Sequence, residues 1–251
     1  EECGTRHDID ETLIKGDALL VAETCEYRRN FLSFSPDVLL VTSVEPDHLD
    51  YFRDGADVES AFEEYADRLP HGGSLVYCAD DSGATRVARA VAARRPDLRV
   101  LAYGTQATGA GALEVTRRLP GALRMRIGGE EFELHVPGDH NALNAAGAVL
   151  VMRELNARLA APSPEDDLAA AAQRAIAGFH GTRRRAELVG EAGGVTVVDD
   201  YAHHPTAIAR TIEGFRSFYP GRRIVLDFMS HTYSRTLALL DEFAEALNRA
   251  D

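Results

Sequence analysis

Short apolar runs alternate with amphipathic stretches along most of this 251-residue chain. Two amphipathic stretches, Val58–Leu69 and Asp81–Arg95, have apolar residues at helical spacing. The apolar runs around them are too short for helices and predict strands over residues 17–22, 36–42, 74–78 and 99–104. Because this alternation is typical of a mostly parallel central sheet with helices on its faces, we expect an α/β fold.

The stretch from Gly111 to Val136 has a different pattern. Its three runs alternate apolar and polar residues, and Pro120-Gly121 and Gly128-Gly129 separate them. Such runs predict a small antiparallel β section with one face in water. Ala-rich helices are expected to follow over residues 141–159 and 164–177.

A further group of strand candidates begins after Thr182. Val195–Val198 has the pattern of a buried strand, and Arg223–Phe228 is a second apolar run. We therefore expect two domains, residues 1–182 and 183–251.

Composition excludes several classes of protein. The net charge of −13 argues against a nucleic-acid surface, and no 18-residue apolar run is present that would span a membrane. Three scattered cysteines suit reduced cytosolic thiols, so we expect a cytoplasmic location. The chain starts with Glu1 rather than Met, which predicts a piece of a longer protein. The oligomeric state stays open.

The richest group of titratable side chains is Asp199-Asp200-Tyr201-Ala202-His203-His204-Pro205. It directly follows the Val195–Val198 run. Ligands of open α/β sheets bind outside the carboxyl ends of the strands, so this segment is a candidate binding site. The alternative is a polar turn before a helix, with Thr206 or Asp200 as its cap.

Glu23 and His48 also follow predicted strands. If both strands lie in one parallel sheet, the carboxylate and the imidazole reach the same edge and are candidates to hold a divalent cation that bridges phosphates. The alternatives are a helix cap for Glu23 and a turn residue for His48.

Three other segments are candidate ligand contacts. Gly138–Asn144 opens a helix, where backbone N–H groups and the amides of Asn141 and Asn144 suit an anion or a purine edge. The alternative, and the more common role for such residues, is that Asn141 or Asp139 is an ordinary helix cap. The Arg183–Arg185 run either neutralises phosphates or is a solvated face. The loop Ser230–Thr236 adds a histidine, a tyrosine and an arginine after the last strand candidate.

Together these segments resemble the Mur ligase family. The strings that carry the resemblance, in chain order, are Glu23-Thr24-Cys25-Glu26-Tyr27-Arg28-Arg29-Asn30-Phe31-Leu32, Asp47-His48, Gly138–Ala146, Arg184-Arg185, Asp199–Pro205 and His231–Thr236. Within the family they are similar to the branch that joins L-alanine to the lactyl carboxylate of UDP-N-acetylmuramate. Members have a UDP-sugar domain, a central ATPase domain and a Rossmann-like domain, and this chain resembles most of the second and the start of the third.

The resemblance implies an ATP-dependent amide ligase of peptidoglycan precursor synthesis that works through an acyl-phosphate. It implies that Glu23 and His48 position Mg²⁺, that Asn141, Asn144, Arg184 and Asp200 face ATP, and that Tyr201, His203, His231 and Arg235 bind the alanine and muramyl groups. Glu23, His48, His203 and Arg235 are the implied catalytic residues.

The chain departs from the family pattern in several places. No Gly-x-x-x-x-Gly-Lys-Ser/Thr motif is present and Lys15 is the sole lysine, so we expect this chain alone not to complete the reaction. Ala186 replaces an aromatic residue, and Thr232 replaces a second arginine, which leaves a two-arginine carboxylate clamp in doubt. The alternatives are a related ligase that attaches a preformed tripeptide and a non-catalytic nucleotide- or UDP-sugar-binding module.

Overall fold

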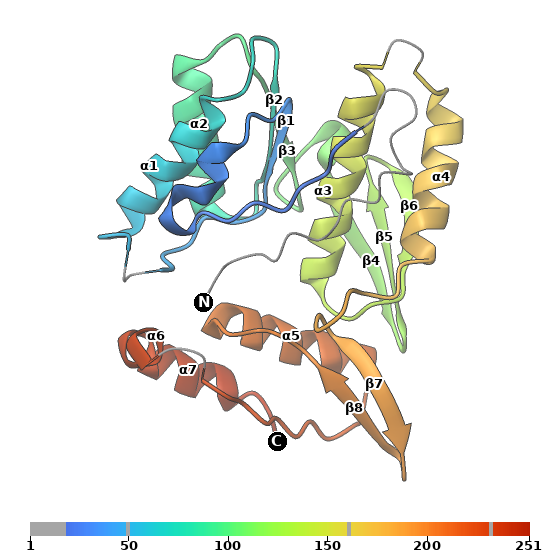
Figure 1. Cartoon of the computed structure of the whole chain (residues 1–251). Helices are drawn as coiled ribbons and strands as arrows, with labels where there is room; N and C mark the ends of the chain where they lie inside the picture. Colours follow the sequence, from blue (N-terminus) through green and yellow to red (C-terminus); the bar gives the residue numbers. More distant parts are fainter. Residues whose placement is uncertain (1–18, 49–50, 160–161, 231–232) are drawn as a thin grey trace.

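The computed structural model describes residues 19–48, 51–159, 162–230 and 233–251 (Figure 1). Its central sheet contains three parallel strands in the order β1 (Val38–Val41), β2 (Ser74–Cys78) and β3 (Arg99–Tyr103). Helices α1 (Gly55–Ala66) and α2 (Ser82–Arg94) cover one face of the sheet, and α3 (Asp139–Asn156) covers the other. The predicted parallel sheet with helices on both faces is confirmed.

Aspartates set the start of both helices that follow the first two strands. The side chain of Asp54 accepts a hydrogen bond from the Asp57 backbone N–H at the start of α1, and Asp81 accepts one from the Ala84 N–H at the start of α2. Each cap satisfies an N–H that has no partner inside its helix. The apolar faces of both helices pack on the sheet through buried residues such as Val58, Val87 and Val91.

The predicted antiparallel section is confirmed as a second sheet. It contains β4 (Leu113–Leu119), β5 (Ala122–Ile127) and β6 (Glu130–Leu134), and a short 3₁₀ turn, η3 (Gly109–Gly111), precedes it. Its apolar face packs against α3 and α4 (Glu165–Ala177) through Met125, Ile127, Phe132 and Leu134. Its other face carries cross-strand ion pairs in water, such as Arg124–Glu133.

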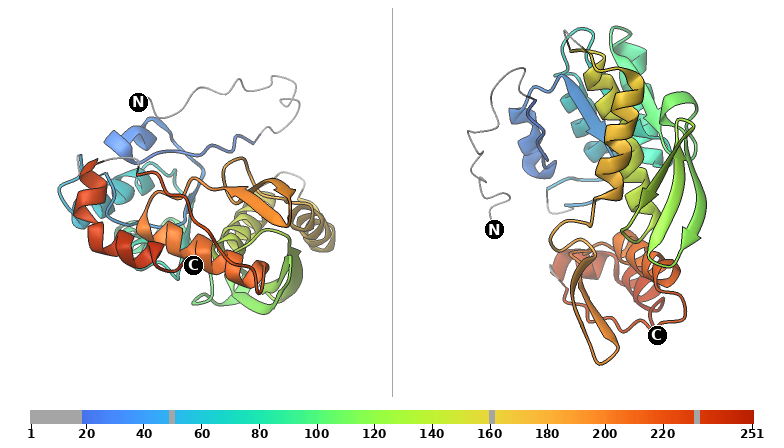
Figure 2. Two further views of the ribbon diagram at one scale, coloured as in Figure 1. Left: turned by 90° about the horizontal axis from the view of Figure 1, so that it is seen from below. Right: turned by 90° about the vertical axis from the view of Figure 1, so that its right-hand side faces the viewer.

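The C-terminal segment begins with a hairpin of β7 (Glu187–Ala192) and β8 (Val195–Asp199), which projects from the rest of the molecule (Figure 2). Helices α5 (Pro205–Phe218), α6 (Tyr233–Ala238) and α7 (Leu240–Leu247) follow. Ile208 and Ile212 of α5 pack against Phe243 and Ala246 of α7 to form a small separate core.

Helix α5 joins the C-terminal segment to the remainder of the chain. Its Gly214 lies against Gly138 at the start of α3, where an added Cβ would be 2.8 Å from the Gly138 Cα. The Gly121 N–H between β4 and β5 donates to the carbonyl of Phe218 at the end of α5. These contacts fix where the loop after β8 lies relative to the parallel sheet.

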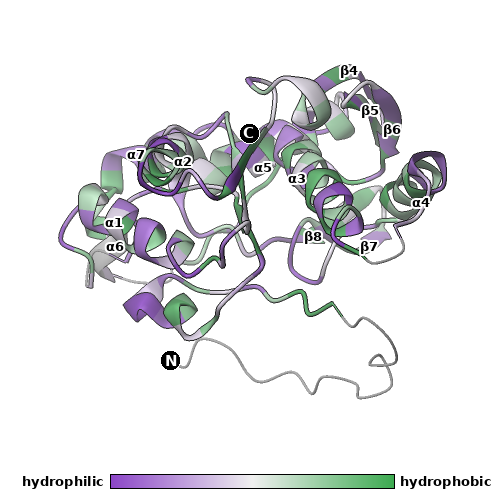
Figure 3. Cartoon of the chain, turned by 90° about the horizontal axis from the view of Figure 1, so that it is seen from above, coloured by the Kyte–Doolittle hydropathy of each residue, from purple (hydrophilic) through white to green (hydrophobic). Residues whose placement is uncertain are grey.

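Two strand predictions, over residues 17–22 and 223–228, are wrong for the described residues, and residues 17 and 18 of the first lie outside them. Residues 19–22 and 223–228 have no regular structure in the described chain, and Leu20, Val21 and Val225 are exposed. A strand needs a hydrogen-bonded neighbour, and no strand of the described residues lies beside either run. Figure 3 shows the first run as a green, hydrophobic trace next to the grey segment.

The hairpin also differs from its prediction. Val195–Val198 does lie in a strand, but Val195 and Val197 are exposed rather than buried, because β8 pairs only with β7 and no layer covers that face among the described residues. Strand β7 itself was not predicted, since Gly190 and the two glutamates, Glu187 and Glu191, weaken its pattern. No helix in the described ranges is long and apolar enough to cross a membrane.

Candidate functional site

The loop after β1 is fixed by the start of α2. The Val44 N–H donates to Oδ1 of Asp81 at 3.0 Å, and the same oxygen caps α2. Gly83 allows this close approach, because a Cβ at that position would lie 2.0 Å from the Val44 carbonyl oxygen. The loop that carries Glu45 and His48 therefore has a defined path beyond the carboxyl end of β1.

His48 lies in a small cluster with the segment before β1. Its Nε2 is 3.4 Å from Oε1 of Glu26, and its ring centroid is 4.6 Å from that of Tyr27. Tyr27 begins the 3₁₀ turn η2 (Tyr27–Ser33), whose Phe31 is buried against α1. The structure thus brings a carboxylate, an imidazole and a phenol together beside the sheet edge.

Glu23 lies three residues before Glu26, in irregular backbone, with an exposed side chain. It neither ends a strand nor caps a helix, because residues 19–22 are irregular and Glu26 is the residue that precedes η2. The carboxylate that contacts His48 is Glu26. Among the described residues no three His, Cys, Asp or Glu side chains are grouped closely enough to hold a metal ion, so ligation by Glu23 and His48 stays a prediction.

Asp200 joins the loop after β8 to the arginine run before β7. Its Oδ2 accepts from the Ala186 N–H at 2.7 Å, and its Oδ1 accepts from the Ala202 N–H at 2.8 Å. The Tyr201 N–H donates to the carbonyl of Arg184, whose guanidinium lies 4.7 Å from the Tyr201 ring centroid. The predicted residues Arg184, Asp200 and Tyr201 therefore form one contact group.

His203 belongs to the same loop. Its Nδ1 is 2.9 Å from the Tyr201 carbonyl oxygen, and the two rings make an edge contact with centroids 5.1 Å apart. A carbonyl oxygen can only accept, so the proton of the neutral imidazole lies on Nδ1 and Nε2 is an acceptor. The backbone thus selects the tautomer of a predicted catalytic histidine.

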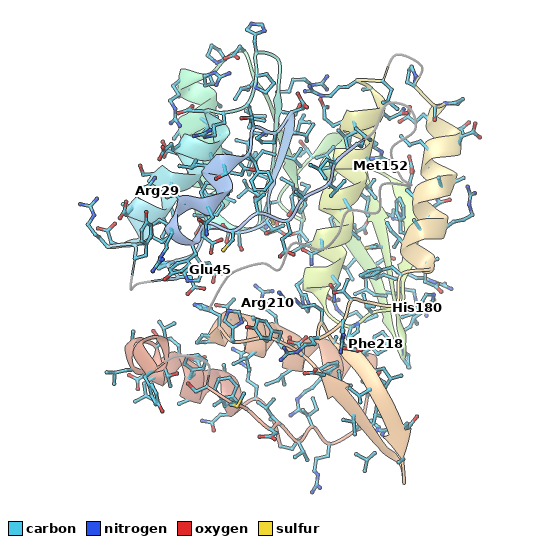
Figure 4. The ribbon with its side chains drawn as sticks, viewed as in Figure 1. Arg29, Glu45, Met152, His180, Arg210 and Phe218 are labelled. Carbon is cyan, nitrogen blue, oxygen red and sulfur yellow. The ribbon has the colours of Figure 1, made fainter. Side chains whose placement is uncertain are left out.

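His204 connects the two halves of the candidate site. It caps α5, with Nδ1 accepting from the Thr206 N–H at 3.4 Å, so the predicted caps Thr206 and Asp200 are both wrong. The same Nδ1 lies 3.7 Å from Oε2 of Glu45, in the loop after β1. Figure 4 labels Glu45 above this junction and Arg210 of α5 below it.

The start of α3 borders the junction as well. Asn141 donates through Nδ2 to the Pro137 carbonyl at 2.7 Å and lies 3.2 Å from Nε2 of His140, whereas Asn144 is exposed one turn further on. Neither Asn141 nor Asp139 caps the helix; Gly138 precedes it, with φ of 97° and no side-chain cap. Asp139 instead forms an ion pair with Arg118.

His140 is a half-buried titratable group at this junction. Burial lowers its pKa, the nearby Asp200 carboxylate opposes that change, and Arg210 adds to it. Its Nδ1 is buried without a hydrogen-bond partner among the described residues. These neighbours put the start of α3 close to both Asp200 and α5.

Left-handed backbone at non-glycine residues occurs only in these segments of the described chain. In the described chain the non-glycine residues with positive φ are Arg28, Arg29, His48, Arg184 and Ala186. Such residues are uncommon, and strained backbone of this kind clusters at functional sites. Arg28 and Arg29 directly follow Tyr27, whose ring contacts His48, and Arg184 and Ala186 lie in the turn that Asp200 holds.

Two predicted substrate residues are not placed. His231 lies outside the described residues, and Arg235 lies in α6 with its side chain outside the described part of the chain. Sequence reasoning also gave no role to Glu26, Tyr27, Glu45, His140 and His204. Four of these five lie inside the motif strings quoted above, so their membership of a motif could have indicated a functional role. For Glu45, the only such indication was its position after β1.

The comparisons with known proteins agree with this geometry. The Mur ligase middle domain model matches residues 1–152, and the Mur ligase glutamate ligase domain model matches residues 184–251. The UDP-N-acetylmuramate--L-alanine ligase of Treponema pallidum is 44% identical over 243 residues, which cover 95% of this chain and 50% of the relative. The ligase of the same name from Mycolicibacterium vanbaalenii is 43% identical, with 92% and 48% covered. The chain thus spans about half the length of these curated relatives.

Solved structures share the fold. The UDP-N-acetylmuramate-alanine ligase of Thermotoga maritima superposes with a TM-score of 0.65 at 23% identity, covering 89% of this chain and 46% of the other. The MurF ligase of Thermotoga maritima, solved in complex with ADP, has a TM-score of 0.65 at 20% identity, covering 86% and 47%. The chain belongs to the Mur ligase family, whose members are ATP-dependent ligases, and it contains parts of the family's middle and C-terminal domains.

Proposed function

We propose that this chain is the part of a cytoplasmic UDP-N-acetylmuramate–L-alanine ligase in which ATP, the muramyl carboxylate and the amino acid meet. One observation carries the proposal: the loop after β1 and the loop after β8 lie side by side, with Glu45 Oε2 3.7 Å from His204 Nδ1. Carboxylate activation and amide formation require phosphate-binding and amine-binding groups within reach of one carboxylate. The 43–44% identical relatives with that name support the choice of substrates.

Glu23 and His48 are the proposed residues for Mg²⁺. The exposed Glu23 carboxylate is an oxygen donor of the kind that Mg²⁺ prefers, and Glu26 lies against the His48 imidazole, which would be the second protein ligand beside nucleotide phosphates. When bound, the cation neutralises charge on the transferring phosphoryl group. Asn141, Asn144, Arg184 and Asp200 are the proposed contacts to ATP.

The second half of the reaction needs a group that accepts a proton from the alanine ammonium, so that the neutral amine can attack. His203 suits this role, because Nδ1 is held by the Tyr201 carbonyl and Nε2 carries the lone pair. Tyr201, His231 and Arg235 complete the proposed substrate contacts, with Arg235 as a bidentate donor to the alanine carboxylate. The amine then attacks the carbonyl carbon of the acyl-phosphate, the C–N bond forms, and phosphate leaves.

The test is a phosphate-release assay on a complete ligase that carries this chain. With ATP and UDP-N-acetylmuramate present, we expect release to require L-alanine, and a Glu23→Ala variant to lose it. Release that requires the preformed tripeptide instead would identify the related tripeptide ligase. ATP and UDP-sugar binding without any release would identify a non-catalytic binding module.

A further inference from the structure

Arg28 and Arg29 form an unusual pair of consecutive residues in left-handed backbone. Their φ and ψ angles are 52° and 24° for Arg28, and 56° and 30° for Arg29. A side chain with a Cβ disfavours this region, so other contacts must hold the turn. Phe31 provides them: it is 2% exposed, and its ring lies 4.6 Å from that of Tyr65.

Arg29 has an evident structural role. Its guanidinium donates to Asp57 at 3.1 Å and to Glu64 at 2.6 Å, both on α1. These ion pairs attach the η2 turn to the helix beside it. The turn is therefore fixed from the α1 side by Arg29 and Phe31, and Arg28 is exposed at its surface.

Arg28 has no comparable partner. Among the residues that the structure describes, no carboxylate pairs with it, although the chain has 40 acidic residues against 27 basic ones. Its one described side-chain contact is with Tyr27, where the guanidinium carbon is 5.3 Å from the ring centroid. A cation–π contact of this kind uses none of the five N–H donors for a hydrogen bond to an acceptor.

The position of this cation connects it to the candidate site. The Tyr27 ring that it contacts also lies 4.6 Å from the His48 ring, and His48 pairs with Glu26. The Tyr27 ring therefore contacts both the Arg28 guanidinium, which has no acidic partner among the described residues, and the His48 imidazole. Planar guanidinium donors match carboxylate and phosphate oxygens in bidentate fashion.

We propose that Arg28, oriented by Tyr27, binds a small oxyanion, the carboxylate or a phosphate group of a substrate, beside His48. The identity of that substrate rests on the proposed function. The binding itself rests on the strained turn, the missing acidic partner and the contact chain from Arg28 through Tyr27 to His48.

The test follows the Tyr27 ring and the His48 imidazole by NMR in the full 251-residue chain. Inorganic phosphate and L-lactate are titrated separately, with sodium chloride holding the ionic strength constant. The variants are Arg28→Gly and Arg28→Lys, and the matched control is Arg53→Ala, which removes an exposed arginine on the other side of Asp57. Glycine adopts the backbone of position 28 without strain, so Arg28→Gly keeps or raises the melting temperature.

We expect saturable shifts of both rings with at least one anion, and a loss of affinity of about tenfold or more in Arg28→Gly, the size expected for a charge-assisted bidentate pair. Arg28→Lys retains part of the affinity and Arg53→Ala retains all of it. Saturation by lactate alone assigns the site to a carboxylate, and saturation by phosphate alone assigns it to a phosphate group.

The absence of saturation with both anions, or full affinity in Arg28→Gly, overturns the proposal. A complete ligase with alanine-dependent phosphate release but no such binding overturns this proposal alone; binding without ligase activity overturns the proposed function alone.

Discussion

Glu154 illustrates how a single buried charge ties the layers of the fold together. It is 3% exposed, its Oε1 accepts from Ser74 Oγ at 2.7 Å and from Arg158 Nε at 3.1 Å, and its Oε2 pairs with Arg99 at 3.0 Å. Arg158 also donates to the Gly72 carbonyl. The cluster attaches α3 to the residues where β2 and β3 begin.

Removal of this carboxylate should destabilise the chain. We expect Glu154→Ala to lower the free energy of unfolding by about 2 kcal/mol, less than for a fully buried pair because both arginines are partly exposed. Glu131→Ala, which removes an exposed partner of Arg126, should change it by less than about 0.5 kcal/mol. Urea denaturation of both variants measures the difference, and equal losses would show that the buried cluster has no special role.

His140 should make stability depend on pH. The unfolded chain takes up a proton on this residue near pH 6.5, and burial lowers the pKa in the folded chain, where Asp200 and Asp139 favour the charge and Arg210 and Arg185 oppose it. As pH falls below about 6.5 the unfolded state therefore binds more protons, and stability decreases.

The variant His140→Gln should remove this component. Between pH 7 and pH 5, we expect its free energy of unfolding to fall less steeply than that of the unmodified chain. His71→Gln is the control, because His71 is exposed and far from the junction in sequence. A slope that is the same for His140→Gln and the unmodified chain would contradict the assignment.

Arg235 is the residue proposed to bind the carboxylate of L-alanine. In a complete ligase, Arg235→Ala should raise the KM for L-alanine by roughly ten- to a hundredfold, because a charge-assisted bidentate pair is lost, and should change the KM for ATP far less. If Arg235 pairs only with Asp227 or Asp241, the variant lowers the melting temperature and leaves the alanine dependence unchanged. Steady-state kinetics with each substrate varied in turn separates these results.

Among helices and strands, the sequence predicted correctly those elements whose limits are set by residues next to them in the chain. The strand at Ser74–Cys78 matches its prediction because a short apolar run ends at the polar pair Asp80-Asp81, and Asp81 then caps the next helix. The run at 223–228 also has an apolar centre, but no strand lies beside it among the described residues. The spacing of apolar residues does not tell whether a second strand is present to pair with. The same reason explains the exposed face of β8.

The close contact between the loop after β1 and α2 should make the chain sensitive to any side chain at position 83. Gly83→Ala places a Cβ about 2.0 Å from the Val44 carbonyl oxygen, so the loop must move or α2 must shift. We expect a loss of about 2 kcal/mol or more in the free energy of unfolding and displaced NMR signals of His48. Gly190→Ala is the control, since an added Cβ there meets no atom within 4 Å. Similar effects of the two substitutions would contradict this role for Gly83.

At the scale of the whole molecule, the candidate site depends on how two segments meet. The motifs predicted Arg184, Asp200, Tyr201 and His203 as functional residues, and the turn before β7 does bring them together. The contact of Glu45 with His204 could not be predicted, because it depends on how α5 seats against α3 through Gly214 and Gly138. The position of α5 against α3 depends on backbone packing between residues that are far apart in the sequence, and no local sequence pattern predicts such packing.

In the proposed function, the complete ligase activates a carboxylate through an acyl-phosphate and then forms an amide. The direct measurement labels the lactyl carboxylate of UDP-N-acetylmuramate with ¹⁸O and analyses the released phosphate by mass spectrometry after reaction with ATP and L-alanine. If the carboxylate oxygen attacks the γ-phosphorus and the amine later displaces phosphate at the carbonyl carbon, each released phosphate carries one ¹⁸O atom. Phosphate without ¹⁸O would mean that water attacks ATP, and it would contradict the claim.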